Sequence, residues 1–306
     1  MQASSSLYEL RRASHAGSWY TANPAELDKE LTSYLSSASQ FPLPEGAKLK
    51  GLIGPHAGFS YSGPTAAWAY INIPPSHYKR VFLLGPSHHA YLSTCALTKS
   101  QYYQTPLGNI EIDREVTEQL HAGGGFQYMS QKVDEQEHSL EMHAPFIRKA
   151  FGEGVKLVPI MVGNLNAKSE QEYGERLAPY LADDQNIFIV SSDFCHWGSN
   201  FDYYHKEQGL EVHQSVEKLD RQGMQLIEDT NPEGFEEYLQ KTDNTICGRH
   251  PIAVFLNAVR SYSLATFGSK VSDKIKTKFV KYAQSNKAMK KTDSSVSYAS
   301  SITYFQ

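Results

Sequence analysis

Residues 81–89 read VFLLGPSHH, so an apolar run ends in a glycine-proline turn that is followed at once by histidines. A similar order recurs at residues 48–56 (KLKGLIGPH) and at residues 186–196 (NIFIVSSDFCH). Continuous apolar runs, without polar alternation, are typical of parallel strands covered on both faces. The three runs therefore predict neighbouring strands in the interior of an α/β sheet.

The histidines that end these runs are His56, His88 and His196. Parallel strands place their carboxyl ends along one edge of a sheet, where open α/β sheets build their binding sites. A single histidine in such a place is more often structural and bonds a loop carbonyl by itself. Three at matching places instead favour a metal site or a reactive pocket assembled from distant parts of the chain.

The rest of the chain alternates between helical and extended patterns. Helices are expected at residues 25–37, 63–70, 113–122, 169–181, 211–228 and 251–262. Further strands are expected at residues 155–162, 278–283 and 294–304, the last half-exposed at the edge of the sheet. These patterns predict one α/β domain over residues 1–306, with a central, largely parallel or mixed sheet flanked by helices and a flexible segment at residues 1–12.

Composition excludes several classes of protein. The 306 residues are 40% hydrophobic, 20% charged and 12% aromatic, which is ordinary for a globular domain. A net charge of −4 gives no electrostatic footprint for nucleic acid. Three cysteines argue against a disulfide framework and for a reducing compartment. We expect neither a secretory signal in the opening MQASSSLYELRR nor a membrane span, which needs about 20 apolar residues.

A cysteine lies in the segment TICGRHP, residues 245–251, just before a predicted helix. A thiol near a helix N-terminus and beside Arg249 is expected to have a lowered pKa. With His56 and His88, Cys247 forms a set of two nitrogens and one sulfur, which suits zinc, copper or iron. A buried, inert thiol is the alternative interpretation of Cys247.

Several further side chains are candidates for the same site. Asp193 precedes His196 by three residues and either orients the imidazole or caps the following turn. Trp19, in the loop SHAGSWY, is either a core residue or a wall of a binding pocket. Tyr61, His196 and Arg249 join Trp19 as candidate ligand-binding residues, with His196 and Arg249 able to receive an anion.

The sequence does not decide the role of one histidine-rich segment. Residues 135–146 (EQEHSLEMHAPF) contain His138, Glu141 and His143, and a short helix would place His138 and Glu141 on one face. Direct metal contact, support of the ligands and a surface position are equally compatible with this pattern. Pro145 is expected to limit the helix.

Eight blocks of this sequence resemble the Memo family of cell-motility mediators, in the same order along the chain. They are ASHAGSWY, PHAGFSYSG, LGPSHH, DEQEHSLEMHAPF, SSDFCHWG, NTICGRHPI, YAQS and DSSVSYA, between residues 13 and 299. The resemblance implies a fold similar to that of class III extradiol, non-haem iron dioxygenases.

The resemblance also implies roles for particular residues. The metal-ligand positions of the family match His56, His88 and Cys247, and its pocket histidine matches His196, with Asp193 beside it. The loop tryptophan of the family matches Trp19. The resemblance further implies iron(II) or copper, together with redox effects and signalling in cell motility, and the thiolate of Cys247 makes zinc a further possibility.

Partners and location follow from the same resemblance. It implies protein signalling partners, among them a phosphotyrosine or other anionic peptide bound in the cleft. It implies a cytoplasmic protein and leaves a nuclear location open.

Three functions are therefore weighed. The first is a metal-binding protein of redox and metal homeostasis. The second is a dioxygenase-like or hydrolytic metalloenzyme with His196 and Asp193 as candidate catalytic residues. The third is a phosphopeptide adaptor. Ring cleavage is not carried over, because dioxygenases of this kind hold iron with two histidines and a carboxylate, where this chain has Cys247.

Overall fold

The computed structural model describes residues 7–74 and 77–306. Its strands are β1 (Tyr8–Arg11), β2 (Lys48–Gly54), β3 (Arg80–Pro86), β4 (Cys95–Leu97), β5 (Ser100–Tyr103), β6 (Ile110–Ile112), β7 (Phe126–Tyr128), β8 (Lys156–Val162), β9 (Asn186–Ser191), β10 (His196–Gly198), β11 (Ile275–Gln284) and β12 (Ser294–Phe305). Its helices are α1 (Pro24–Ser37), α2 (Phe59–Tyr70), α3 (Arg114–Ala122), α4 (Gln131–Gln136), α5 (His138–Glu141), α6 (Ala144–Phe151), α7 (Ala167–Leu181), α8 (Val212–Glu228), α9 (Pro232–Thr242) and α10 (Arg249–Phe267).

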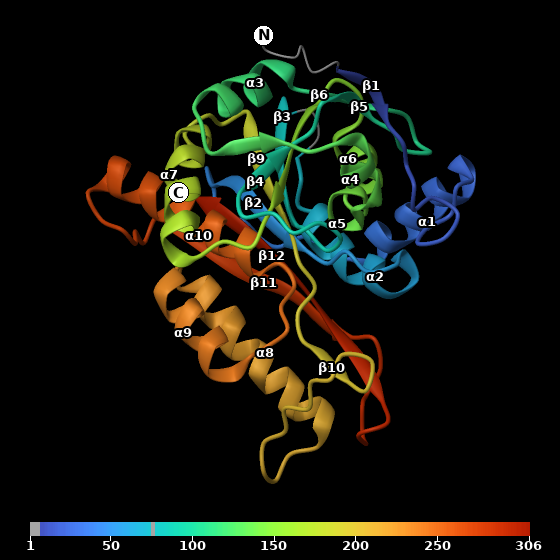
Figure 1. The fold of residues 1–306 in the computed structure, drawn as a ribbon. Coiled ribbons are helices and arrows are strands. Elements are labelled where there is room, and N and C mark those ends of the chain that lie inside the picture. The colour runs from blue at the N-terminus through green and yellow to red at the C-terminus, as the bar shows by residue number, and fades with distance from the viewer. Residues whose placement is uncertain (1–6, 75–76) are drawn as a thin grey trace.

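Within the described residues these strands form one mixed sheet, in the order β1-β5-β6-β8-β3-β9-β2-β12-β10, with β11 and the β4–β7 pair attached beside it. The centre of the sheet, β8-β3-β9-β2, is parallel, and β12 continues it in the antiparallel sense. Figure 1 shows helices around this central sheet. The expected α/β fold with a mixed central sheet is confirmed.

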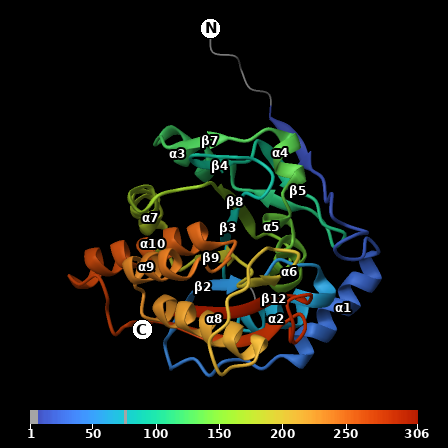
Figure 2. The same cartoon turned by 60° about the horizontal axis from the view of Figure 1, so that its bottom comes forward.

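The parallel strands are buried on both faces, as their continuous apolar sequences predicted. On β3, Phe82 and Leu84 pack on one side, whereas Val81 and Leu83 pack on the other. The first core lies against α7 and α10, and the second lies against α1, α2 and α6, which Figure 2 shows on separate sides of the sheet.

The register of the strands determines where their ends lie. Gly54 of β2 pairs with Ser191 of β9, and Leu84 of β3 pairs with Val190 of β9. All three strands run in the same direction and therefore end along one edge. The loops that follow them carry the histidines of residues 56, 88 and 196.

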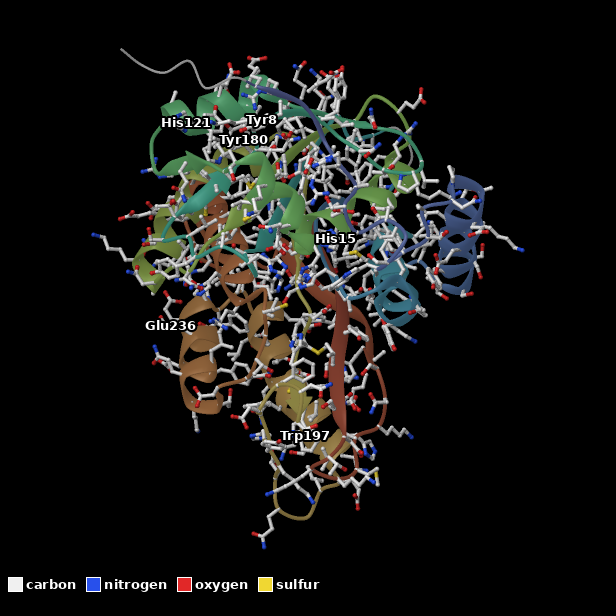
Figure 3. All side chains as sticks on the ribbon, turned by 45° about the vertical axis from the view of Figure 1, so that its right-hand side comes forward. Tyr8, His15, His121, Tyr180, Trp197 and Glu236 are labelled. Atoms are coloured by element: carbon white, nitrogen blue, oxygen red, sulfur yellow. The ribbon has the colours of Figure 1, made fainter. Side chains whose placement is uncertain are left out.

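A second group of elements extends beyond that edge. The long antiparallel pair β11–β12 reaches past the body of the sheet and pairs there with β10. Helix α8 lies beside this extension (Figures 1 and 2), and Figure 3 places Trp197 of β10 within it. The indole of Trp197 is buried and donates a hydrogen bond to the carbonyl of His205.

The secondary structure departs from the expectations in several places. Helix α2 begins at Phe59, with Gly58 as its N-cap, so Pro64 lies inside the helix instead of near its start. Helix α9 was missed, although Asn231 caps it and Pro232 occupies its first turn. The helix that starts at His138 ends at Glu141, before Pro145 as expected, and Pro145 lies in the first turn of α6. Strand β12, expected to be half-exposed, is buried along most of its length, because it lies inside the sheet between β2 and β11.

The N-terminal segment also differs from the expectation. Residues 8–11, expected to be flexible, form β1 parallel to β5, and Arg11 is fully buried. The expectation for residues 1–6 lies outside the described residues. In residues 7–74 and 77–306, none of the helices has both the length and the apolar character that crossing a membrane requires.

Candidate metal centre

His56 follows β2 and is fully buried at the edge where the parallel strands end. Its Nδ1 lies 2.6 Å from the hydroxyl of Ser191, and that hydroxyl donates its proton to the carbonyl of Ser139. The Nδ1 atom must therefore carry the proton, which leaves a lone pair on Nε2. Burial, followed by the nearby histidines, holds the pKa of His56 well below its usual range, so the ring is neutral.

His88 follows β3 and is held by a carboxylate. Glu137 accepts hydrogen bonds from the backbone N–H of His88, at 2.6 Å, and from its Nδ1, at 2.8 Å. Burial alone would raise the pKa of Glu137, but the hydrogen bonds and the charge of His88 lower it to about 2. An ionised carboxylate on Nδ1–H fixes the tautomer and leaves Nε2 of His88 free, as in carboxylate–histidine–metal arrangements.

His138, the first residue of α5, completes the cluster of imidazoles. One ring nitrogen from each of His56, His88 and His138 lies within 4.8 Å of the others. The ring of His138 is stacked between His88, at 4.3 Å, and Trp19, at 4.4 Å. Its buried Nδ1 has no hydrogen-bond partner among the described residues, and burial lowers the pKa of His138 to about 3. The rings of His56 and His138 are therefore neutral.

Cys247 brings sulfur to the same place. Its Sγ lies 3.2 Å from Nε2 of His56 and accepts a hydrogen bond from the backbone N–H of Asp193. The following Gly248 permits this approach, because a Cβ there would lie 2.5 Å from the carbonyl oxygen of Ser191. The structure therefore brings His56, His88 and Cys247 to one place, and adds His138.

The expected thiolate character of Cys247 is not found. Burial, together with the carboxyl of Asp193, raises the pKa of Cys247. Arg249 does not offset this, because it is exposed and lines a separate hollow with Glu170 and His250. Arg249 is close to Cys247 in sequence but not in its effect, because Cys247 lies before α10 and faces His56, whereas Arg249 begins the helix and faces solvent.

Asp193 lies in the site but does not orient His196. Its carboxylate accepts a hydrogen bond of 2.8 Å from the backbone N–H of His56. Burial raises the pKa of Asp193 to about 7, against the effect of the backbone N–H groups of His56 and Ala57. Asp193 therefore fixes the loop that carries His56.

His196 is oriented by a different segment. Its Nδ1 donates to the carbonyl of Thr245 at 3.0 Å, while the hydroxyl of Thr245 accepts from the backbone N–H of His196. Burial lowers the pKa of the ring, which is neutral and keeps a lone pair on Nε2. The ring lies edge-on to Phe201 at 5.0 Å.

Glu141 and His143 do not join His138. Glu141 accepts hydrogen bonds from Arg11, His15 and Tyr20, and Figure 3 shows His15 near the middle of the molecule. The Nδ1 atom of His143 lies 2.8 Å from the hydroxyl of Tyr70, inside the core. His138, Glu141 and His143 therefore lie in three different environments: the cluster of imidazoles, the ion pair with Arg11, and the core beside Tyr70.

Trp19 and Tyr61 lie together beside the cluster of His56, His88 and His138. Both line a hollow of about 570 Å³, which Phe201 and Tyr298 also line. His196 meets this hollow through Phe201, whereas Arg249 does not line it. Of the four expected ligand-binding residues, three are thus in or next to one pocket.

Two supporting residues, Glu137 and Ser191, were missed from the sequence. Glu137 directly precedes His138 in the histidine-rich segment, so a search for a carboxylate next to a histidine would have found it. Ser191 ends β9, at the register position opposite Gly54, and becomes recognisable only once the strands are paired.

The donor set matches the preferences of transition metals. Neutral imidazole nitrogens and a cysteine sulfur suit zinc, copper and iron, whereas magnesium and calcium prefer oxygen. The lone pairs of His56 and His88 are both on Nε2, with Nδ1 held by a hydrogen-bond partner. The residues present therefore fit a transition-metal ion.

Comparisons with known proteins agree with the resemblance seen in the sequence. The family described as "Memo-like protein" matches residues 11–302. "Protein MEMO1" of Danio rerio is 47% identical over 293 residues, covering 94% of this chain and 95% of that protein, and "Protein MEMO1" of Homo sapiens is 45% identical with the same coverage. "Protein memo-1 homolog" of Caenorhabditis elegans is 42% identical over 297 residues, 96% of this chain and 82% of that protein. A crystal structure of an uncharacterized protein from Escherichia coli shares the fold, with a TM-score of 0.51 at 11% identity, covering 82% of this chain and 99% of that one.

Proposed function

The chain belongs to the Memo-like protein family, and we propose that it binds one transition-metal ion through His56, His88 and Cys247. His138 is proposed as a fourth donor. The observation that carries the proposal is the convergence of three imidazole nitrogens within 4.8 Å, with a thiol 3.2 Å from one of them. Such a group of nitrogen and sulfur donors is the kind that a transition-metal ion binds.

Iron(II) and copper are the proposed ions, and zinc is the third that the donors accept. A bound iron or copper ion supplies one-electron exchange, which the side chains themselves do not provide. The protein contributes the shape of the site, since Ser191 and Glu137 hold the rings of His56 and His88. Roles in redox and metal homeostasis, and in motility-linked signalling in the cytoplasm, are proposed as consequences of this binding.

A second candidate is a metal-dependent enzyme in which His196 acts as a general base. Its support is the neutral ring of His196, whose Nδ1 is engaged by Thr245 while Nε2 is free. A base in that state accepts a proton from a substrate held in the pocket beyond Phe201. Asp193 would act indirectly, through the backbone of His56.

Titration of the purified protein with iron(II), copper and zinc tests the first proposal. Wild type is expected to bind one equivalent, and the His56→Ala/His88→Ala variant is expected to lose more than the roughly 10–100-fold typical of changes behind the ligands. His89→Ala is the matched control, because His89 is adjacent in sequence, exposed and outside the group of three imidazoles. Equal affinity of the double variant and the control would reject the proposed site.

The second candidate has its own measurement. His196→Ala is expected to keep the metal content of wild type but to lose oxygen consumption with catechol-type substrates under iron loading. Loss of metal from folded His196→Ala protein would instead make His196 a ligand.

A further inference from the structure

The turn between β11 and β12 concentrates positive charge at one place on the surface. Residues 285–293 read SNKAMKKTD, with three lysines against one aspartate, whereas the whole chain has a net charge of −4. Lys287, Lys290 and Lys291 are all exposed. Among the described residues none of the three forms an ion pair, whereas Lys278 of β11 pairs with the glutamate that ends α8. The charge of the turn is therefore available to a partner.

The shape of the turn is fixed by hydrogen bonds within it and to α8. The carboxylate of Asp293 accepts hydrogen bonds from the backbone N–H groups of Met289, at 2.9 Å, and Lys290, at 3.1 Å. Ala288 is buried, and its carbonyl accepts a hydrogen bond of 3.2 Å from the backbone N–H of His213. The turn is thus held to the molecule at Ala288, while the side chains on both sides of that residue are exposed.

Apolar surface lies among these cations. Met289 is 52% exposed, and Tyr204, in the loop after β10, is 40% exposed. That loop contacts the turn through a hydrogen bond of 3.3 Å from the backbone N–H of Ser199 to the carbonyl of Asp293. Residues 287–292 do not line the hollow of about 570 Å³, and Figure 1 shows the turn at the end of the molecule away from the N-terminus. The basic turn is therefore a projection that combines cationic and apolar side chains.

We propose that the turn between β11 and β12 docks on a phospholipid surface that carries negative charge. Ammonium groups are attracted to anionic headgroups, and an exposed apolar side chain such as that of Met289 enters the boundary between headgroups and acyl chains. A lipid surface accepts a projecting turn of this kind, whereas recognition of an acidic peptide relies on a groove or a free strand edge. The docking is peripheral and does not depend on the metal ion.

Sedimentation of the full chain with vesicles tests the proposal. Vesicles of phosphatidylcholine and phosphatidylserine are expected to bind the protein, and vesicles of phosphatidylcholine alone are expected not to bind it. Added salt is expected to release the protein, because salt screens exposed charges. Absence of binding to the anionic vesicles overturns the proposal. Binding of a polyglutamate peptide without binding of the anionic vesicles would overturn it in favour of an acidic protein partner.

Charge variants locate the docking surface. Lys287→Gln/Lys290→Gln/Lys291→Gln is expected to lose about fivefold in vesicle affinity for each lysine, or about 100-fold in all. The matched control removes the same charge from three exposed lysines on α1, α4 and α9, namely Lys29, Lys132 and Lys241. This control is expected to bind the anionic vesicles within a few-fold of wild type. Equal losses from the two triple variants would mean that net charge drives binding, and would overturn the assignment of the turn.

A fluorescent variant reports the insertion of the apolar side chain. The emission of Met289→Trp is expected to move to shorter wavelength when anionic vesicles are added, because the indole leaves water. Val271→Trp is the matched control, since Val271 is 55% exposed beside Lys270 in the loop after α10, which Figures 1 and 2 show far from the turn. No shift from Met289→Trp, or an equal shift from Val271→Trp, contradicts docking through this turn.

Discussion

Helix α5 contributes to two polar clusters that differ in kind. Its first residue, His138, faces the imidazoles of His56 and His88, whereas its last residue, Glu141, is surrounded by hydrogen-bond donors. In the second cluster Arg11 donates to Glu141 and to the carbonyls of Asp134 and Glu137. The carboxylate of Glu141 is compensated by Arg11 within the chain and therefore stabilises the fold, whereas the buried Nδ1 of His138 has no hydrogen-bond partner among the described residues.

The largest expected effect is on the compensated cluster. Arg11→Met leaves the buried carboxylate of Glu141 without its cation and is expected to cost about 3–5 kcal/mol of unfolding free energy. Metal affinity of the folded fraction is expected to remain that of wild type. Denaturant unfolding and calorimetry measure the two quantities.

Arg12→Met is the matched control for that change. The guanidinium of Arg12 pairs with Glu135, but its side chain is 72% exposed, so the expected loss of unfolding free energy is much smaller than that of Arg11→Met. Equal losses for Arg11 and Arg12 would show that the buried cluster does not have the stabilising role given to it.

Asp220 extends the comparison to a buried carboxylate whose hydrogen-bond donors are all neutral. Buried Asp220 accepts hydrogen bonds from the N–H of Cys195, the amide of Asn244 and the hydroxyl of Tyr282. Burial raises its pKa to about 6, against about 3.9 in an unfolded chain. The native state therefore binds a proton more tightly, and stability is expected to fall as pH rises from about 4 to about 6.

The size of that effect is about 1.4 kcal/mol per pKa unit, and Asp220→Asn is expected to remove it. The titratable neighbours Cys195, Tyr238 and Tyr282 stay neutral in this range, because burial raises the pKa of each. Unfolding free energies of wild type and variant, measured from pH 4 to pH 7, give the difference in slope. Parallel curves would mean that Asp220 does not titrate in this window.

The next effect concerns the metal cluster. Glu137→Gln removes the charge that fixes Nδ1 of His88 and is expected to weaken metal binding by about 10–100-fold. Glu135→Gln is a suitable control, because Glu135 bonds Arg12 and Gln131 instead of a histidine. A control variant that loses as much affinity as Glu137→Gln would break the link between Glu137 and the metal.

The smallest effect is expected from Trp19. Trp19→Leu removes the ring stacked on His138 and is expected to lower metal affinity by about 2–10-fold, in line with the worth of an aromatic contact. Trp68→Leu serves as the control on α2. A loss as large as that of Glu137→Gln would mean that Trp19 determines whether His138 is placed at all.

The sequence was sufficient for the strands that carry the site. Continuous apolar runs before His56 and His88 predicted parallel strands, and strand direction alone predicted that both residues would meet. Cys247 could be added to the set of candidate metal ligands because the preference of transition metals for sulfur and nitrogen donors does not depend on the fold. Local chemistry and strand direction are properties that a sequence carries directly.

The remaining features depend on packing. His138, Glu141 and His143 have similar local patterns, and only the docking of α5 and α6 on the sheet determines which of them faces the cluster. The predicted lowering of the pKa of Cys247 was wrong, because burial outweighs the effect of a helix terminus and burial depends on how the whole chain packs. The sequence left the role of Asp193 open, because its partner is the backbone N–H of His56, 137 residues away in sequence.

The most direct test of the account is the absorption spectrum of the protein loaded with cobalt(II), a spectroscopic substitute for the metals proposed here. Wild type is expected to bind one equivalent and to show a thiolate-to-cobalt charge-transfer band together with the visible bands of a low-coordinate ion. Cys247→Ser is expected to lose the charge-transfer band but keep weaker binding through His56, His88 and His138, and Cys95→Ser is expected to retain the full spectrum. A wild-type spectrum without the charge-transfer band, or one that survives Cys247→Ser, would contradict the site described here.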